Sequence, residues 1–466
     1  MAYATLVCLL LSCLCSRYCS IALAIAHEDH GFRTVSTRSM ESGTECSAST
    51  STVNNPHASG ATLPLAHRHG PCAPVRTDGE KPSFAETLRR DRSRARHVVG
   101  RARRRLAGSD DGASIPTYLG SSVDSLQYVV TVGLGTPAVE QTVLIDTGSD
   151  LSWVQCQPCN ATACYPQKHP LFDPSSSSTY APVPCGAVAC RNLTLDFYGN
   201  GCTNTSGSSL CSYGIVYGNS ATTTGVYSTE TLTLKRGVVV KNFGFGCGHS
   251  QHGPYDKFDG LMGLGGAPES LVSQTSHTYG GAFSYCLPPV DSAAGFLALG
   301  APANTSGFVF TPMRRLATTF YEVKLAGVSI GGEDLDIAPS VLSGGMIIDS
   351  GTIITSLPAT AFAALRSAFR KAMAAYPLAP PVGHLDTCYN LTGYANVTVP
   401  RVALTFSGGA TVDLDVPSGI LSGGCLAFVG ASEDNVTTVL GNVNQRTVEV
   451  LYDVAGGRVG FRAGAC

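Results

Sequence analysis

The chain has 466 residues, a formal net charge of −2 and only 14% charged residues. This length is enough for two or three domains with hydrophobic cores of their own. No apolar run reaches the roughly 18–20 residues of a membrane helix, so we expect no membrane span. The composition is rich in Gly, Ser and Thr, with short apolar runs between turn residues, and this predicts an all-β protein.

The first 24 residues have the pattern of a secretory signal peptide. Ala4–Leu11 forms a short apolar core, and Ala22-Leu23-Ala24 is a small-x-small cleavage site. We therefore expect residues 1–24 to be removed and the rest of the chain to enter the secretory pathway.

Cysteines and glycosylation sequons agree with export. Of 18 cysteines, twelve lie between Cys156 and Cys466, an even number that can pair fully in an oxidising compartment. Seven Asn-x-Ser/Thr sequons are expected to carry glycans. They are Asn160, Asn192, Asn204, Asn304, Asn390, Asn396 and Asn435.

Residues 25–117 form a basic leader ahead of an acidic body. Residues 27–80 are polar and expected to be largely flexible. Residues 82–106 predict a helix that carries nine arginines between Arg89 and Arg105. Such an arginine run could bind nucleic acid. We favour a prosegment over a nucleic-acid-binding arm, because a basic segment lying across an acidic cleft explains the same residues in an exported chain.

From Tyr118 onward, strand patterns such as Tyr128–Val132 and Thr142–Ile145 repeat to the end of the chain. One helix is expected at Ala361–Ala375, where apolar residues recur at helical spacing. A join at Pro302–Pro312 divides this body into lobes of residues 118–305 and 306–466.

Two segments about two hundred residues apart match each other. Residues 143–149 read V-L-I-D-T-G-S, and residues 346–352 read M-I-I-D-S-G-T. A later apolar-apolar-Gly element follows each of them, at Leu261-Met262-Gly263 and at Val439-Leu440-Gly441. This duplication predicts one carboxylate, Asp146 or Asp349, at the end of a buried strand in each lobe.

Two carboxylates brought face to face can share one proton and act as a general acid–base pair on a bound water. Ser149 and Thr352 are placed to donate hydrogen bonds to the carboxylates. Thr147 and Ser350 can bond across the pair, and Gly148 and Gly351 permit the tight turns. The pattern therefore predicts a hydrolase of peptide bonds.

A hairpin at Tyr217-Gly218-Asn219-Ser220 follows Asp146 by about seventy residues. A mobile flap over a cleft excludes water and holds substrate. We expect Tyr217 and Gly218 to belong to such a flap, with Tyr217 bonded to Trp153.

These residues resemble the pepsin-like aspartic peptidases, specifically the plant nepenthesin-type group. Residues 146–153 are similar to the first motif of the group and residues 348–352 to the second. The cysteine-rich stretch from Cys156 to Cys211 is similar to the insertion that marks the group. The hairpin has Asn219 where the group commonly has Asp, which bears on pH profile and substrate preference.

The resemblance implies a bilobal all-β fold with a cleft between two duplicated lobes. The basic leader ahead of an acidic body separately predicts a zymogen whose prosegment is its inhibitor. The resemblance also implies an endopeptidase that acts on polypeptides at acidic pH with no cofactor. We further expect a monomer and no metal. From the signal peptide we expect secretion to the apoplast, or alternatively delivery to the vacuole or another secretory compartment. By analogy the disulfides would be Cys156–Cys159, Cys164–Cys247, Cys185–Cys211, Cys190–Cys202, Cys286–Cys466 and Cys388–Cys425.

Other interpretations are open at this point. Some plant proteins of this architecture are catalytically silent glycosidase inhibitors, and others are described as proteases that also bind DNA. Cys156-x-x-Cys159 could be a redox or zinc motif, although a structural disulfide fits an exported chain better. Residues 248–252, G-H-S-Q-H, fall short of a serine nucleophile elbow because His252 replaces the final Gly.

Overall fold

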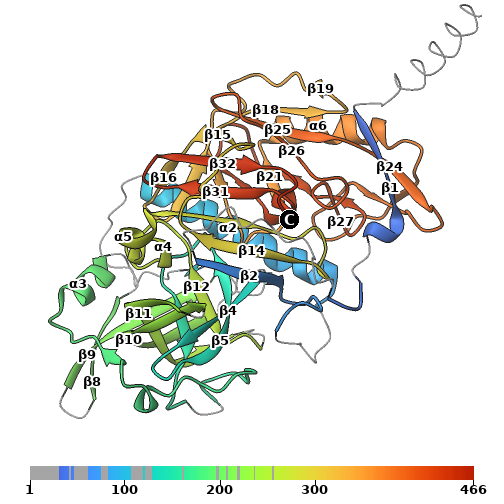
Figure 1. Ribbon diagram of the computed structural model, residues 1–466. Coiled ribbons are helices and arrows are strands. Elements are labelled where there is room, and N and C mark those ends of the chain that lie inside the picture. The colour runs from blue at the N-terminus through green and yellow to red at the C-terminus, as the bar shows by residue number, and fades with distance from the viewer. Residues whose placement is uncertain are drawn as a thin grey trace, which may run out of the picture.

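The structure is a computed structural model. It describes residues 31–40, 43–46, 61–74, 82–106, 119–120, 128–159, 162–195, 199–205, 208–217, 221–235, 237–253 and 257–466. In these ranges strands dominate, and they form two β lobes with one long helix, α2, between them (Figure 1). The expected all-β bilobal fold is confirmed. No helix in the described part of the chain is long and apolar enough to cross a membrane.

The leader contributes four elements to this assembly. They are β1 (Phe32–Ser36), η1 (Thr37–Met40), β2 (Ala61–His67) and α2 (Phe84–Leu106), followed by the short β3 (Leu119–Gly120).

The first lobe contains most of the long strands. Its elements are β4 (Tyr128–Leu134), β5 (Val139–Asp146), β6 (Trp153–Gln155), η3 (Pro174–Ser176), β7 (Ala181–Pro182), α3 (Val188–Leu195), β8 (Gly199–Thr205), β9 (Ser208–Tyr217), β10 (Thr222–Lys235), β11 (Val238–His252), β12 (Gly260–Gly263), α4 (Leu271–Gln274), α5 (Ser276–Tyr279), β13 (Ala282–Cys286) and β14 (Ala294–Leu299).

The second lobe consists of shorter strands around one helix. Its elements are β15 (Val309–Pro312), β16 (Arg314–Leu316), β17 (Phe320–Val323), β18 (Leu325–Ile330), β19 (Glu333–Asp334), β20 (Met346–Ile348), β21 (Thr355–Leu357), α6 (Ala359–Ala372), β22 (Leu378–Ala379), β23 (Cys388–Tyr389), β24 (Asn396–Pro400), β25 (Val402–Phe406), β26 (Thr411–Asp413), β27 (Leu421–Ser422), β28 (Cys425–Leu426), β29 (Phe428–Gly430), β30 (Thr438–Leu440), η4 (Asn442–Gln445), β31 (Glu449–Asp453) and β32 (Arg458–Arg462).

One continuous sheet joins the two lobes. Its strands follow the order β15-β32-β31-β13-β14-β2-β4-β5-β12-β6-β11-β10-β9-β3. The leader strand β2 is interior to this sheet, because it pairs with β14 on one side and β4 on the other. Leu63 and Leu65 of β2 are buried in the main core.

The expectation that residues 27–80 are largely flexible is therefore wrong for their described part. Besides β2, strand β1 pairs with β24 of the second lobe over five residues, and Cys46 is disulfide-bonded to Cys72. The polar composition concealed these strands, since each completes a sheet whose other strands come from elsewhere in the chain.

The duplicated apolar-apolar-Gly elements pass directly beneath the aspartate loops. Strand β12 runs parallel to β5, with Gly263 opposite Asp146, and β30 runs parallel to β20. A Cβ added to Gly263 would lie 2.0 Å from the carbonyl oxygen of Asp150, and one added to Gly441 would lie 2.5 Å from that of Ile353. Only glycine allows this approach.

All twelve cysteines of the body are paired, but four of the six expected pairs are wrong. The bonds are Cys156–Cys247, Cys159–Cys164, Cys185–Cys202, Cys190–Cys211, Cys286–Cys466 and Cys388–Cys425. The parallel pairing of β6 with β11 brings Cys156 beside Cys247, which leaves Cys159 to bond with Cys164. In the hairpin of β8 and β9, Cys202 and Cys211 lie opposite each other, yet each bonds to a cysteine outside the hairpin.

Candidate active site

The two aspartates lie at equivalent places in the two lobes. Asp146 is the last residue of β5, and Asp349 directly follows β20. Both side chains are fully buried in this form of the protein. The preceding apolar residues of each strand are in the core, so the strand ends fix both carboxylates at the junction between the lobes.

Each carboxylate is held by the turn that follows it. Ser149 Oγ donates to Asp146 Oδ2 over 2.6 Å, and Thr352 Oγ1 donates to Asp349 Oδ2 over 2.5 Å. The backbone N–H of Gly148 and of Gly351 donates to the Oδ1 atom of the aspartate two residues earlier. These are the donor positions that the sequence predicts for both hydroxyl side chains.

The two turns are also bonded to each other. Ser350 N donates to Thr147 Oγ1 over 2.9 Å, and Thr147 N donates to Ser350 Oγ over 3.2 Å. These reciprocal bonds fix one aspartate loop relative to the other, as expected from the duplicated hydroxyl residues.

The flap residues are partly described. Trp153 Nε1 donates to Tyr217 Oη over 2.6 Å, and both side chains are buried. Gly218 and the rest of the hairpin tip lie outside the described residues. The predicted contact between Tyr217 and Trp153 is thus present.

A leader arginine lies between the two carboxylates. Arg94 of α2 donates from Nη2 to Asp146 Oδ1 and to Asp349 Oδ1, each over 2.6 Å, and from Nε to Asp349 Oδ2 over 2.9 Å. Burial lowers the pKa of the Arg94 guanidinium, but the two carboxylates raise it further, so its net pKa is above the usual value. Arg94 is therefore a cation without exposed surface, paired with both aspartates.

The turn of α2 before Arg94 makes a second polar contact. Asp91 accepts from the backbone N–H of Ile353 over 2.6 Å and from that of Ile354 over 3.0 Å. These two residues follow Thr352 directly. Burial raises the pKa of Asp91 to about 7, against the opposing effects of the two N–H donors and Arg94.

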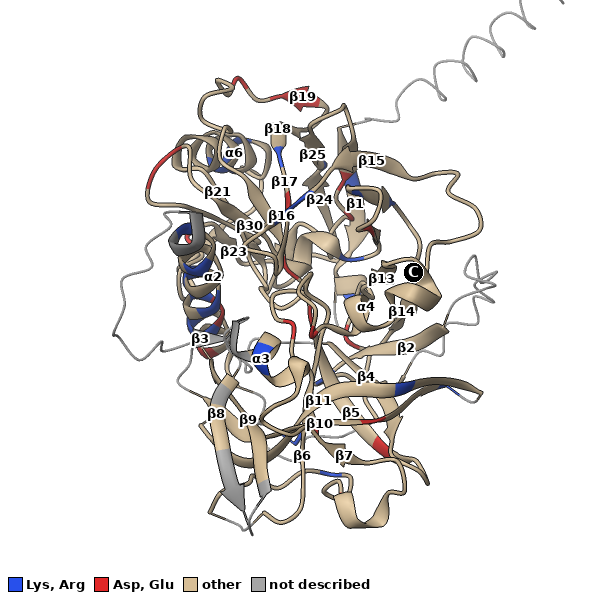
Figure 2. Cartoon of the chain, turned by 90° about the vertical axis from the view of Figure 1, so that its left-hand side faces the viewer, with Lys and Arg blue, Asp and Glu red and all other residues tan. Residues whose placement is uncertain are grey.

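Apolar contacts hold α2 on either side of Arg94. Leu88 is buried in a cluster with Ile353, Ile354 and Leu385. Val98 and Ala102, about one and two turns beyond Arg94, pack in another cluster. Figure 2 shows α2 as the densest concentration of Lys and Arg in the described chain. Helix α2 thus lies across the junction between the lobes, held by these two apolar clusters and by the ion pairs of the buried Arg94.

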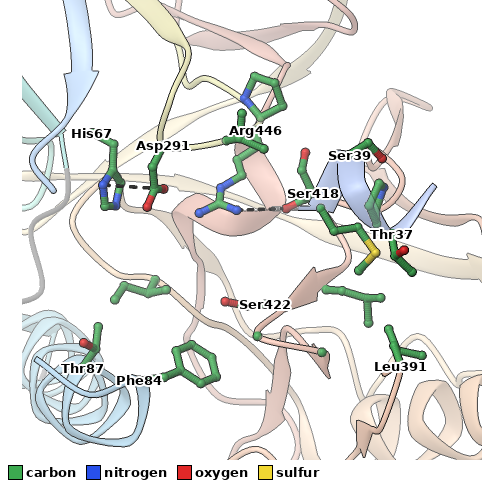
Figure 3. Close-up of a pocket in the computed structure, with 18 of the residues that line it drawn as sticks. Thr37, Ser39, His67, Phe84, Thr87, Asp291, Leu391, Ser418, Ser422 and Arg446 are labelled. Atoms are coloured by element: carbon green, nitrogen blue, oxygen red, sulfur yellow. Dashed lines mark hydrogen bonds and ion pairs between the residues drawn. The ribbon is translucent and has the colours of Figure 1, made fainter. Parts of the chain in front are cut away.

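A cavity of about 610 Å³ remains where the start of α2 meets the body. Figure 3 shows Phe84 and Thr87 of α2 on one wall, opposite Arg446 and Asp291 of the body. Ile353 also lines this cavity, so it borders the aspartate loops. The leader thus leaves one end of the interlobe junction unfilled.

Sequence reasoning missed the distinct position of Arg94. Arg94 was one of nine arginines in the predicted helix, and nothing in the composition separates it from its neighbours. The available signal was its spacing, since Asp91 and Arg94 are three residues apart and share one helix face with Leu88 and Val98. By contrast Arg92, Arg96 and Arg103 are exposed.

Five of the seven sequon asparagines have exposed side chains in the structure. These are Asn192, Asn304, Asn390, Asn396 and Asn435. Asn160 and the side chain of Asn204 lie outside the described residues. Exposure is what glycan attachment requires, and their glycosylation stays a prediction.

Comparison with known proteins identifies the two lobes. Residues 128–301 match the family model described as xylanase inhibitor N-terminal, and residues 320–463 match the one described as xylanase inhibitor C-terminal. The structure resembles basic 7S globulin from soybean, with a TM-score of 0.58, 21% identity and coverage of 72% of this chain and 90% of that one. It resembles conglutin gamma from lupine seeds with a TM-score of 0.58 and 20% identity, covering 72% and 91%. At 20–21% sequence identity these two matches show similarity of fold only.

Curated relatives are more similar in sequence. Aspartyl protease AED1 of Arabidopsis thaliana is 37% identical over 98% of both chains. Another Arabidopsis aspartyl protease family protein is 41% identical over 90% of this chain and 91% of its own length. Aspartic proteinase nepenthesin-2 of Nepenthes gracilis is 33% identical, covering 77% and 81%. The chain therefore belongs to the plant pepsin-like aspartic protease family and is an aspartic-type endopeptidase.

Proposed function

We propose that Asp146 and Asp349 are the catalytic pair of this endopeptidase. We also propose that the chain is made as a zymogen, whose leader blocks the pair until the pH falls. The substrate would be a polypeptide lying along the junction that α2 now occupies.

The chemistry follows from two carboxylates that share one proton. The ionised carboxylate takes a proton from a water held between the pair, and that water attacks the scissile carbonyl carbon. The protonated carboxyl donates its proton to the carbonyl oxygen. Ser149 and Thr352 keep one oxygen of each carboxylate bonded and so orient the other towards the water.

One observation supports the zymogen proposal. Arg94 contacts both carboxylates at hydrogen-bonding distance, so its guanidinium takes the place that the attacking water would need. Breaking a buried ion pair by removing one partner typically costs about 3–5 kcal/mol. In the leader-bound form the guanidinium therefore occupies the space between the two carboxylates and offsets part of their negative charge.

Replacement of Arg94 tests this proposal. We expect Arg94→Gln, in the full-length chain, to hydrolyse a denatured protein at a pH where the unaltered chain is inactive. Arg94→Lys should lie between the two, because an ammonium keeps the charge without the planar fork of donors. Arg103→Gln is the matched control, since it removes an exposed arginine from the same helix. Equal latency of Arg94→Gln and Arg103→Gln, with both folded by circular dichroism, would rule out the blocking role.

An inhibitor function is the second candidate, because the two matching family models are described by xylanase inhibition. The site argues against loss of catalysis in this chain. Both aspartates, both hydroxyl donors and both crosswise bonds are intact. Failure of the full-length chain, after incubation at acidic pH, to cleave any denatured protein between pH 2 and pH 7 would favour the inhibitor.

We further propose export through the secretory pathway, to the apoplast or alternatively the vacuole. The motivation is the signal-like residues 1–24 together with exposed sequon asparagines. N-terminal sequencing and glycan analysis of the purified protein test this. A chain that retains Met1 and carries no glycan would argue against it.

A further inference from the structure

The second half of α2 covers one face of the C-terminal lobe that borders the aspartates. Val98 and Ala102 pack there against Leu316 and Phe320, and Phe320 has no exposed surface while the helix is bound. If the leader departs, as proposed above, this apolar face becomes part of the substrate cleft.

The leader also places a cationic head group on the same face. The guanidinium carbon of Arg101 lies 5.7 Å from the centroid of the Phe320 ring, within the range of a cation–π contact. Its Nη2 approaches Thr319 Oγ1 at 3.5 Å. The Phe320 ring and the Thr319 hydroxyl therefore contact the same guanidinium, next to the apolar face that Val98 and Ala102 cover.

The charged residues near this face favour binding of a cation beside Thr319 and Phe320. Thr319 Oγ1 donates to Asp150 Oδ2 over 2.8 Å, so a fully buried carboxylate lies directly behind the hydroxyl. The neighbouring cation, Arg315, is turned towards Gly266 and donates to its carbonyl oxygen over 2.7 Å. The guanidinium of Arg101 thus meets a ring face and a hydroxyl oriented by an anion.

We propose that Phe320, Thr319 and Leu316 form a substrate pocket that selects a long cationic side chain, arginine above lysine. The apolar wall would contact the methylene stem, while the ring face and the hydroxyl would contact the head group. Arginine is preferred because its planar guanidinium stacks on an aromatic ring and is more weakly hydrated than an ammonium. This inference rests on the proposed leader release.

The helix also gives the distance of this pocket from the catalytic pair. Arg101 lies seven residues beyond Arg94, which is about 10 Å along a helix axis. An extended peptide advances about 3.3 Å per residue. The cationic side chain should therefore be roughly two to four residues from the scissile bond, on one side of it only.

A matched peptide set tests the pocket. Peptides would carry arginine, lysine or norleucine at each position two to four residues from the scissile bond, on either side, and kcat/KM would be measured with the full-length chain after activation at acidic pH. At one position we expect arginine to exceed norleucine by about 2- to 30-fold, the range of a cation–π contact. Phe320→Leu should bring that ratio close to one while the norleucine peptide is still cleaved.

Phe308→Leu is the control variant, because Phe308 lies under the guanidinium of Arg462, 4.4 Å away, in a different part of the lobe. It should leave the arginine ratio unchanged. Each ratio is taken within one enzyme preparation, so partial unfolding of a variant does not change it. Absence of an arginine preference at every position, or its persistence in Phe320→Leu, would overturn the pocket while leaving the peptidase intact. Failure of all peptides to be cleaved would instead reject the proposed function and the pocket with it.

Discussion

One leader side chain, Arg94, contacts both buried carboxylates at the interlobe junction, those of Asp146 and Asp349. Arginine suits this place because its donors reach two acceptors at once, with Nη2 shared between Asp146 and Asp349. A buried guanidinium is tolerated only because both anions surround it. The pairing also means that neither carboxylate can be altered without affecting the leader.

At this scale we predict that Asp146→Asn or Asp349→Asn abolishes peptidase activity without unfolding the chain. Asparagine is nearly isosteric with aspartate but cannot exchange the proton that the reaction requires. Turnover of a denatured protein and the thermal unfolding curve would be measured on each variant.

The matched control is Asp173→Asn, because Asp173 lies outside the site, is partly exposed and caps η3, a role that asparagine also performs. This control should keep full activity. Near-normal turnover by either of the two site variants would mean that the pair does not act as proposed.

At the scale of elements, the sequence predicts the helices and turns, because the contacts that form them join residues a few positions apart. Helix α2 was predictable at residues 82–106 because a run of good helix formers follows Pro82 and Ser83. The helix expected at 361–375 is present as α6, Ala359–Ala372. The turns around Asp146 and Asp349 were predictable because each donor lies within three residues of its acceptor.

Elements that depend on distant partners could not be predicted in this way. Strand β2 pairs with β14, more than two hundred residues later, and no feature of residues 61–67 indicates that partner. Four of the six expected disulfides are wrong for the same reason. The partner of Cys156, for example, is decided by the parallel register of β6 and β11. Arg94 lies in the predicted helix, but its contact with Asp146 and Asp349 depends on how the helix docks on the body. The local sequence does not specify that docking.

The interior position of β2 gives a prediction about stability. Leu65 has no exposed surface and belongs to the main core. Replacing it with alanine should lower the free energy of unfolding of the full-length chain by about 2–5 kcal/mol. Val239→Ala, at an exposed position of β11, should change it by no more than about 0.5 kcal/mol. Urea unfolding of both variants checks this, and equal effects would mean that β2 is not part of the folded core.

At the scale of the whole molecule, two groups couple leader docking to pH in opposite directions. With the leader docked, burial together with Arg92 and Arg96 lowers the pKa of His384 from 6.5 to about 4. Leader release therefore takes up a proton between these values, so a falling pH favours release. Burial raises the pKa of Asp91 from 3.8 to about 7. Docking takes up that proton, so a falling pH across this window favours docking.

These opposed effects predict that His384 shifts the pH of activation. Beside it Asp386 is paired with Arg366, which leaves the two arginines of α2 as the charges that oppose its protonation. His384→Gln cannot take up the proton, so leader release should begin at a lower pH than in the unaltered chain. The onset of peptidase activity would be followed from pH 7 to pH 3.

His277→Gln removes an exposed histidine of α5 and serves as the control, for which we expect no change. An onset that is the same in both variants, or a higher onset in His384→Gln, would contradict the coupling. This experiment is independent of Arg94, because the blocking contact is unaltered in either variant.

The shared nitrogen of Arg94 also has a mechanical consequence. Its two acceptors belong to different halves of the duplicated body, so the bound helix bridges the halves at the centre of the junction. A rigid-body rotation of one half against the other would lengthen one of these contacts. While the helix is bound, such rocking is opposed at the point where a peptide would later need room to enter and leave. Departure of the leader would then restore a degree of motion to the molecule as well as access to its carboxylates.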